Sequence, residues 1–216
     1  MSDIIAGTAV GVCQIIIGYP IDTIKVLIQN KQQWMGLNLK SYYKGYKYPF
    51  IGSMTYNMLA FPIYERTIHI TKSNFISGFL RGIIISPFVF LIDIGKIKNQ
   101  TGSKLTIKDL YNTKGFYSNL LRESLASGIY FSSYHYCKSD LHYSILLSGG
   151  IAGLATWTLT YPIDVIRTRQ IAQNISITKS IHQRNLWKGY IPCAIRAVLV
   201  NSISFYVYEI VKKECG

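Results

Sequence analysis

The sequence predicts an all-α membrane protein with six transmembrane helices, arranged as three copies of one unit. Three observations support this fold class. Only 15% of the 216 residues are charged, whereas soluble domains carry about 25%. Uncharged runs of nearly bilayer length lie at Ile4–Ile21, Tyr48–Tyr64 and Ser144–Ile163. One pattern of aspartate, basic residue and glycines recurs along the chain with a period of 71 residues.

The repeat is centred on Asp22, Asp93 and Asp164, which are spaced by 71 residues. A basic residue follows each aspartate by three positions, two glycines precede it by fifteen and eleven, and a Lys-Gly pair comes later. In chain order the basic residues are Lys25, Lys96 and Arg167, the glycines are Gly7, Gly11, Gly78, Gly82, Gly149 and Gly153, and the pairs end at Gly45, Gly115 and Gly189. Because five positions agree in three registers, the chain divides into units 1–72, 73–142 and 143–216.

Each unit contains two apolar runs joined by a polar link. We therefore expect helices over 4–27, 49–68, 75–98, 119–138, 144–168 and 190–212. The glycines spaced by four lie on one face of the first helix of each unit, where they allow another helix to approach closely. Flexibility alone does not predict the same register three times. The link around Ser103–Tyr111 is long enough for a short amphipathic helix at the membrane surface.

The net charge of +13 invites a nucleic-acid interpretation, but the basic residues recur in the polar links rather than on one helix. Contact with membrane lipid fits this distribution better, so we expect no nucleic-acid polymer as partner. The links inside the units carry twelve Lys and Arg, against five in the links between units and at the C-terminal end. The within-unit links therefore share one compartment, and both termini face the other.

Several other classes of protein have little support. The N-terminal MSDII has an acid where a signal peptide needs a basic leader, and the four cysteines form no CxxC pair or disulfide framework. No nucleophile–base motif, phosphate loop or HExxH motif occurs, so we expect no enzyme. His135, Cys137 and His142 are spaced too loosely to predict a metal site.

The three aspartates and three bases lie near the ends of the first helices, at one depth. A charge at the centre of a membrane helix costs about 2.5–3.5 kcal/mol, so these six side chains should face inward and pair. Pairing at i, i+3 within one helix is one arrangement, and pairing between units, which closes a ring, is the other. Pro20 and Pro162 each precede an aspartate by two positions and remove a backbone hydrogen bond, which kinks the helix. A ring of this kind opens when a ligand supplies compensating interactions, so we interpret it as a gate.

These residues resemble the signature of the mitochondrial carrier family, Pro-x-Asp/Glu-x-x-Lys/Arg, and the resemblance covers nearly the whole chain. Pro20–Lys25 and Pro162–Arg167 match fully, whereas Leu91–Lys96 has leucine for proline, with Pro87 one turn earlier. The resemblance implies a six-helix barrel with threefold pseudosymmetry in the mitochondrial inner membrane. Its central cavity would open alternately to each side.

The resemblance also implies two gates. On the matrix side, Asp22 would pair with Lys96, Asp93 with Arg167 and Asp164 with Lys25, with Gln29 and Gln100 as braces and Ile171 where a third glutamine is expected. The cytosolic gate would comprise Tyr64, Glu65, Tyr134, His135, Lys138, Tyr208, Glu209 and Lys212. Only Glu65 and Lys138 form a full ion pair by the family's pairing. This gate should be the weaker one, which would favour a cytosol-open empty protein.

The repeats are shorter than those of the family. By the resemblance, Gly45, Gly115 and Gly189 would hold the phosphates of cardiolipin on backbone amides, and this lipid is the only cofactor implied. A capping glycine beside a solvated lysine is the alternative. The resemblance implies a monomer that takes a small-molecule substrate and a counter-substrate.

The family's substrate contacts fall at mid-depth on the second helix of each unit, here near Gly52, Asn57, Arg122, Glu123 and Arg196. The adjacent Arg122 and Glu123 resemble the contacts of carriers for ornithine, carnitine or S-adenosylmethionine. Arg122 would bind a carboxylate and Glu123 an ammonium or sulfonium group. The alternative is a charge pair at a helix start, which Asn119 would cap.

Two other functions stay open. A nucleotide or deoxynucleotide carrier would use the arginines within helices, Arg81, Arg122 and Arg196. A non-transporting membrane scaffold on a decayed carrier fold would explain Leu91 and the incomplete cytosolic gate. The richness in Ile, Asn, Lys and Tyr, with 17 Tyr, is typical of an AT-rich genome such as that of a parasite, a protist or a large virus. For a viral protein the target membrane would be in a host mitochondrion.

Overall fold

The computed structural model describes residues 2–50, 63–64, 66–103, 106, 114–197 and 199. For residues 2–15 and 145–146 it describes the backbone alone. Within these ranges the chain is helical and contains no strand. The elements are α1 (Ser2–Gln29), α2 (Leu39–Tyr42), α4 (Asn74–Gln100), α6 (Phe116–His135), the π-helical turn η1 (Tyr136–Asp140), α7 (Ile145–Gln173) and α8 (Ile177–His182). Residues 47–50, 66–71 and 190–197 are also helical.

The three long helices α1, α4 and α7 coincide with the expected first helices of the three units and run a few residues further at their C-terminal ends. The expected helix over 119–138 is α6, which continues into η1. The expected helices over 49–68 and 190–212 are only partly described. Among the helices in the described ranges, α4 alone is long and apolar enough to cross a membrane, so the six-span barrel stays a proposal.

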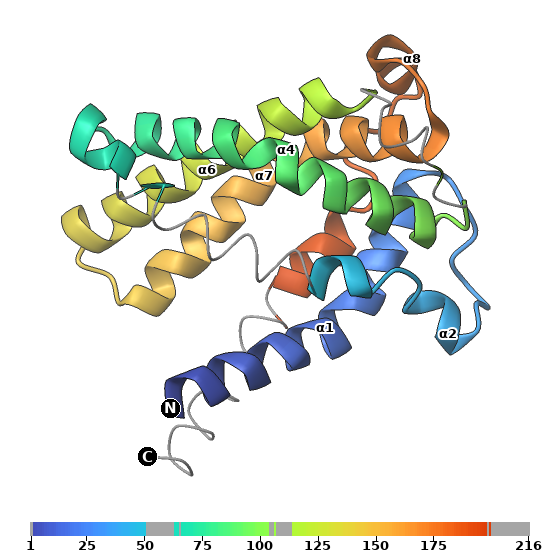
Figure 1. Ribbon diagram of the computed structural model, residues 1–216, viewed down its shortest axis with the longest axis horizontal. Helices are drawn as coiled ribbons and strands as arrows, with labels where there is room; N and C mark the ends of the chain where they lie inside the picture. The colour runs from blue at the N-terminus through green and yellow to red at the C-terminus, as the bar shows by residue number, and fades with distance from the viewer. Residues whose placement is uncertain are drawn as a thin grey trace.

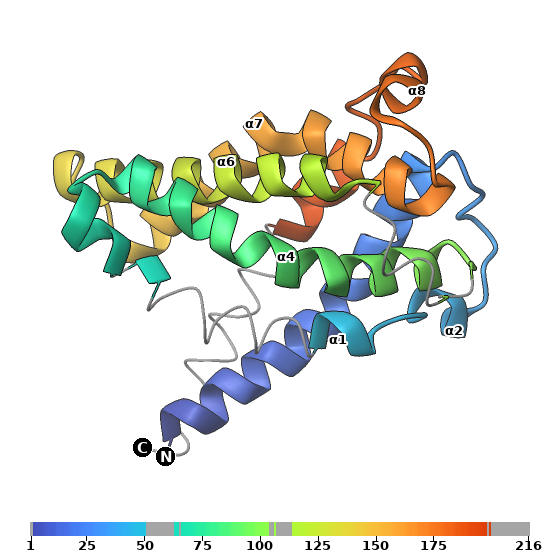
Figure 2. The ribbon, with the colours of Figure 1, turned by 45° about the horizontal axis from the view of Figure 1, so that its top comes forward.

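The helices α4, α6 and α7 pack side by side, with α6 in contact with both neighbours (Figure 1). The remaining long helix, α1, contacts α4 and α7, and its N-terminal end diverges from them (Figure 2). The short helices α2 and α8 belong to the polar links of the first and third units. Most of the link around Ser103–Tyr111 lies outside the described residues.

Two of the repeated glycines allow α4 to approach α6 closely. A Cβ atom on Gly78 would lie 2.5 Å from the carbonyl oxygen of Ser127, and one on Gly82 would lie 2.5 Å from that of Glu123. A larger residue at either position would therefore push the helices apart. This contact fixes the backbone of α6 at Glu123, and so places a candidate site residue.

The corresponding glycines of the other units show no close helix contact among the described residues. A Cβ atom on Gly149 would have the Tyr130 hydroxyl 4.0 Å away, and one on Gly153 would have no described atom within 4 Å. The expected neighbour of this face, the helix over 190–212, is mostly undescribed. Gly7 and Gly11 lie in α1, but their surroundings are outside the described side chains.

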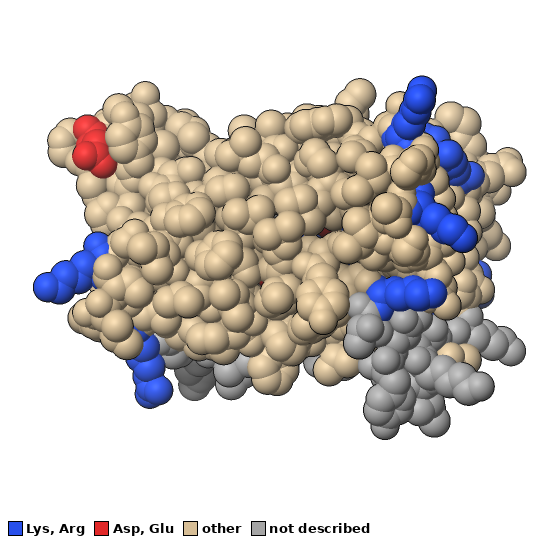
Figure 3. Space-filling model, turned by 90° about the horizontal axis from the view of Figure 1, so that it is seen from above, with Lys and Arg blue, Asp and Glu red and all other residues tan. Residues whose placement is uncertain are grey.

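Three prolines lie inside the long helices, Pro20 in α1, Pro87 in α4 and Pro162 in α7. The second unit therefore also has a proline within its first helix, one turn earlier than in the other units. Charged side chains on the face drawn in Figure 3 gather toward its two ends, and the band between them shows almost none. Such a band suits a surface that faces lipid, because charged side chains are costly there.

Candidate functional site

Three ion pairs join the helices α1, α4 and α7. Lys25 of α1 lies 2.7 Å from Asp164 of α7, and Lys96 of α4 lies 2.9 Å from Asp22 of α1. The third pair joins Arg167 of α7 to Asp93 of α4. These are the three partners that the family resemblance implies, and each pair bridges two units. One i, i+3 contact accompanies them, because Arg167 also lies 3.0 Å from Asp164.

The Lys25–Asp164 pair is the most enclosed of the three. Its side chains are only 9% and 1% exposed, and the amide nitrogen of Gln29 donates to the Asp164 carboxylate at 3.2 Å. The same amide donates to the hydroxyl of Tyr161. On the other side, the Lys25 ammonium lies 4.3 Å from the ring centroid of Trp157, within the range of a cation–π interaction. Gln29 therefore occupies the place of a brace.

The second glutamine differs from the expectation. Among the described contacts, Gln100 donates to the hydroxyl of Thr23 at 3.1 Å and not to the Asp22–Lys96 pair itself. Thr23 in turn donates to the carbonyl oxygen of Tyr42. Gln100 therefore holds Thr23, the residue that follows Asp22 in α1, and has no hydrogen bond to Asp22 among the described contacts.

The third unit has no glutamine at this position. Ile171 packs in an apolar cluster with Val26, Phe90, Ile94 and Ile97 from the other two long helices. The aliphatic side chain closes the space between the helix ends but offers the Asp93–Arg167 pair no hydrogen bond.

The ion pairs line a cavity of about 420 Å³. Its charged lining consists of four carboxylates and five cations: Asp22, Asp93, Glu123 and Asp164, with Lys25, Lys96, Arg122, Arg167 and Arg196. Trp157, Pro49, Val89 and Ile92 contribute to the rest of the wall. The cavity therefore offers charges of both signs beside apolar and aromatic surface, a lining suited to a small polar or zwitterionic solute.

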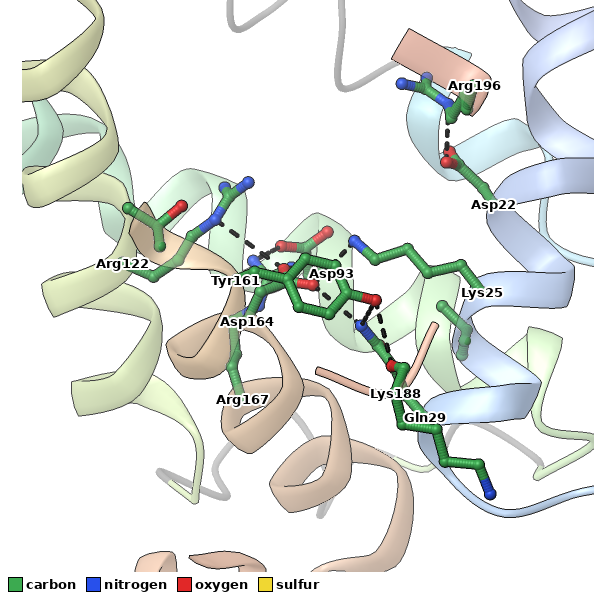
Figure 4. Close-up of polar contacts among 12 residues, drawn as sticks. Asp22, Lys25, Gln29, Asp93, Arg122, Tyr161, Asp164, Arg167, Lys188 and Arg196 are labelled. Carbon is green, nitrogen blue, oxygen red and sulfur yellow. Dashed lines mark hydrogen bonds and ion pairs between the residues drawn. The ribbon is translucent and has the colours of Figure 1, made fainter. Parts of the chain in front are cut away.

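Three candidate substrate residues line this cavity, and Figure 4 shows two of them, Arg122 and Arg196, beside the ion pairs. Arg122 is bonded to Glu123, and its Nε lies 3.8 Å from Asp164. Arg196, in the helix over 190–197, places its Nε 2.6 Å from a carboxylate oxygen of Asp22. Glu123 lies 4.0 Å from Arg167. Gly52 and Asn57 lie outside the described residues.

The alternative of a charge pair at a helix start is wrong. The helix α6 begins at Phe116, and its N-cap is Gly115. Asn119 lies inside the helix, where its amide donates to Ser86 of α4 and its carbonyl oxygen accepts from Arg167. The side chain is too far along the helix to cap it and instead bonds two neighbouring helices.

Arg81 does not reach the cavity. Its guanidinium donates to the Ser127 hydroxyl at 2.6 Å and lies 5.1 Å from the ring centroid of Phe131. Of the three arginines that favour a nucleotide, only Arg122 and Arg196 line the cavity.

The sequence does not predict the roles of three residues at this site, Trp157, Arg169 and Asn119. Trp157 stands two turns before Asp164 in α7, a spacing that places both on one helix face and could have indicated it. Arg169 is fully buried and donates to the carbonyl oxygens of Gln29, Ser180, Arg184 and Asn185 at 3.0–3.3 Å. It ties the third polar link to the end of α1. The role of Asn119 has no signal in the sequence pattern.

The expected cytosolic gate is described only in part. Tyr64 donates to Asn74 and stacks on Phe131, and the Lys138 ammonium lies 5.8 Å from the ring centroid of Tyr134. His135 contacts the hydroxyl of Ser139. The other expected members, Glu65, Tyr208, Glu209 and Lys212, lie outside the described residues, so the pairing of this gate stays a prediction.

The Lys-Gly pairs form turns that begin helices. Gly45, Gly115 and Gly189 have φ values of 83°, 93° and 87°, a backbone region that favours glycine. The hydroxyl of Tyr19 donates to the carbonyl oxygen of Lys44 at 2.6 Å, and that of Tyr161 to Lys188 at 3.1 Å. The first and third turns are thereby fastened to the helices that carry Asp22 and Asp164, whereas the second unit has Phe90 at the equivalent position.

Comparison with known proteins gives consistent results. The family model described as "Mitochondrial carrier protein" matches residues 139–215. Relatives include "Mitochondrial substrate carrier family protein S" of Dictyostelium discoideum, 26% identical over 100% of this chain and 98% of the relative. The human "Mitochondrial basic amino acids transporter" is 27% identical, with 97% and 89% covered. "Mitochondrial arginine transporter BAC2" of Arabidopsis thaliana is 26% identical, with 96% and 89% covered. The first alignment spans 281 positions against 216 residues here, so that relative carries segments that this chain lacks.

Proposed function

Because this chain belongs to the mitochondrial carrier family, we propose that it is an alternating-access transporter of the mitochondrial inner membrane. It spans the membrane with six helices, acts as a monomer, and exchanges an amino-acid-type solute for a counter-substrate. For a viral source the membrane is that of the host mitochondrion. The protein carries no catalytic machinery in this proposal, and its work is the movement of solute between two compartments.

The observation that carries the proposal is the contact between the candidate substrate residues and the ion pairs. Arg122 and Glu123 line the same cavity as Asp164 and Arg167, and Arg196 meets Asp22 (Figure 4). A solute in this cavity therefore competes for groups that hold the helix ends together. The three pairs act as the matrix gate, which is closed in this arrangement and opens when the solute supplies replacement contacts.

The charge distribution supports an amino acid as substrate. A carboxylate can bind the guanidinium of Arg122 or Arg196, and charge-assisted pairs of this kind are strong. The substrate ammonium or guanidinium can bind Glu123. The Trp157 ring, which already lies under Lys25 and 5.0 Å from Arg122, offers a cation–π surface. Similarity to transporters of basic amino acids and of arginine favours the basic members of this class, with ornithine, carnitine and S-adenosylmethionine as related candidates.

A nucleotide or deoxynucleotide is the second candidate. It is favoured by the excess of cations over carboxylates in the cavity lining, because a phosphate group needs several positive partners. The position of Arg81 outside the cavity weakens it. A non-transporting scaffold is less supported, because the three ion pairs of the gate are complete.

We also propose cardiolipin as a bound lipid. The glycine turns at Gly45, Gly115 and Gly189 place backbone amides at the starts of helices, where a phosphate binds favourably. Gly115 begins α6, a helix long enough for its dipole to contribute.

Transport by the purified protein in liposomes tests the substrate. We expect uptake of labelled arginine or ornithine to depend on an internal amino acid, and we expect little uptake of labelled ADP or dATP. The substitution Glu123→Gln should reduce uptake of basic amino acids by about tenfold or more, the effect of losing one buried ionic contact. Ser124→Ala is a matched control, because Ser124 is buried beside Glu123 and bonds only its own helix backbone among the described contacts.

Two results would contradict the proposal. Nucleotide uptake without amino-acid uptake would replace the first candidate by the second. Unchanged transport of basic amino acids by the Glu123→Gln variant would remove this residue from the substrate site.

A further inference from the structure

The Asp93–Arg167 pair lacks the glutamine that stands beside the other two pairs. Gln29 bonds Asp164 directly, and Gln100 bonds the residue next to Asp22. The equivalent position of the third unit is Ile171, which lies in an apolar cluster. Arg167 also donates to Asp164 through Nη2 at 3.0 Å, so the question is what fixes Nη1, the nitrogen that pairs with Asp93.

Asn119 supplies an acceptor at this place. Its side-chain oxygen accepts from Nη1 of Arg167 at 2.8 Å, and the same Nη1 donates to Asp93. The Asn119 side chain is fully buried, and Arg167 is 7% exposed. The guanidinium is thereby held between the carboxylate of α4 and the amide of α6.

The other end of the Asn119 amide is anchored to α4. Its nitrogen donates to both the carbonyl oxygen and the hydroxyl of Ser86, at 3.0 and 2.9 Å. Ser86 is fully buried and directly precedes Pro87, the proline that lies one turn earlier than in the other units. The Asn119 side chain therefore connects α4, α6 and α7 beside the Asp93–Arg167 pair. Asp93 belongs to the second unit, in which the proline lies one turn earlier than in the other two.

The position of Asn119 on α6 also links it to the cavity. Residues 119, 122 and 123 are spaced by three and four, so they lie on one helix face. Arg122 and Glu123 line the cavity, and Glu123 lies 4.0 Å from Arg167. A displacement of α6 caused by a solute at Arg122 and Glu123 would move Asn119 relative to Arg167.

We propose that Asn119 is a positioning residue of the matrix gate, which holds Arg167 against Asp93 in place of the missing glutamine. This inference rests on the proposed gate but not on the identity of the substrate. Asn119 acts on the ion pair through Arg167, and the bond between them is made while the helix ends are together.

Access to a thiol at the helix junction tests this role without any substrate. Ile171 is 4% exposed and packs in the apolar cluster between α1, α4 and α7, so Ile171→Cys is protected while the gate is closed. The reporter is placed in a chain whose four native cysteines are replaced by alanine or serine. The rate of its reaction with a hydrophilic methanethiosulfonate is measured in the purified protein, well below the unfolding temperature.

We expect Asn119→Ala to raise this rate by about tenfold, the factor that corresponds to the loss of one hydrogen bond to a charged group. Ser118→Ala is the matched control. Ser118 precedes Asn119, is buried, and makes its own 2.6 Å bond to Gln170 of α7 without touching an ion pair. Its substitution should change the rate by less than about twofold.

Measuring Asn119→Ala in a second variant, Asp93→Asn, distinguishes a residue that positions Arg167 from one that only packs between helices. In Asp93→Asn, Arg167 has already lost its partner on α4, so adding Asn119→Ala should raise the rate by less than about twofold. A purely structural residue would give the same factor in both backgrounds. Should Asn119→Ala not fold, Asn119→Ser is measured instead with the same expectation, because serine is too short to reach Arg167.

The proposal is overturned if Asn119→Ala reacts no faster than Ser118→Ala, or if its effect multiplies with that of Asp93→Asn. These outcomes are independent of transport. A protein that carries no amino acid but shows the expected rates would contradict the proposed substrate and leave the role of Asn119 intact.

Discussion

The α1–α7 corner and the α1–α4 corner of the proposed gate contain the same kind of ion pair in different surroundings. At the α1–α7 corner, Lys25 and Asp164 are 9% and 1% exposed and are bordered by Gln29 and Trp157. At the α1–α4 corner, Lys96 and Asp22 are 19% and 14% exposed. Because burial raises the cost of an unpaired charge, the α1–α7 corner should contribute more to closure, although the repeats are alike in sequence.

The comparison also separates the polar partners of the two corners. Arg196 contacts Asp22 at the more exposed corner, whereas Arg122 approaches Asp164 at the enclosed one. A solute carboxylate that binds either arginine would therefore act on a different pair. The three ion pairs have a threefold arrangement, but the arginines of the cavity that contact them differ from corner to corner, so the proposed gate should respond asymmetrically to a solute.

The largest effect should come from breaking the enclosed pair. Asp164→Asn leaves Lys25 and Arg167 facing a neutral amide in a buried site, a loss of about 3–5 kcal/mol. We expect exchange in liposomes to fall by at least about a hundredfold, with a lower unfolding temperature. Exchange within a few-fold of the native rate would show that this corner does not control the gate.

Asp22→Asn should have a smaller effect, because its partners Lys96 and Arg196 are more exposed and retain better contact with water. We expect a loss of exchange of about tenfold, which corresponds to about 1.4 kcal/mol. The two variants are compared in one preparation at equal amounts of folded protein. A loss greater than that of Asp164→Asn would reverse the order of the two corners.

The two glutamines should differ in the same direction. Gln29→Ala removes bonds to Asp164 and Tyr161, and we expect exchange to fall by about threefold to tenfold. Gln100→Ala removes a bond to Thr23 and should change exchange by less than about twofold. Equal losses in the two variants would mean that Gln100 supports its ion pair as directly as Gln29 does.

The smallest effect should come from the tyrosines that fasten the Lys-Gly turns. Tyr19→Phe removes the bond to the carbonyl oxygen of Lys44, which contributes about 1 kcal/mol. We expect thermal unfolding in detergent to shift down by about 2–4 °C, and the stabilisation by added cardiolipin to decrease. The second unit is the natural comparison, because Phe90 stands at the equivalent position and packs edge-on against Phe116.

The sequence was sufficient to predict the helices α1, α4 and α7 and the partners of Asp22, Asp93 and Asp164. The helices follow from the lengths of the apolar runs. The ion-pair partners follow from the repeat together with the pairing that the family resemblance implies. The close approach of α4 to α6 at Gly78 and Gly82 follows from the same repeat.

The partners of single polar side chains could not be predicted in this way. The sequence favours a helix cap at Asn119 because asparagine is common at that position, but the bonds it makes to Ser86 and Arg167 depend on how three helices meet. The bond of Gln100 to Thr23 and the burial of Arg169 against four carbonyl oxygens have the same origin. Contacts of this kind are set by tertiary packing, which has no period in the sequence.

In the proposed mechanism, three acid–base pairs keep the helix ends together and separate when the solute passes. The most direct test is the exchange of labelled arginine or ornithine by the single variant Asp93→Lys in liposomes, with thermal unfolding as a check that the protein is folded. A lysine at this position would face Arg167, so the account predicts that exchange is lost in a folded protein. Exchange at the native rate in the folded variant would contradict it.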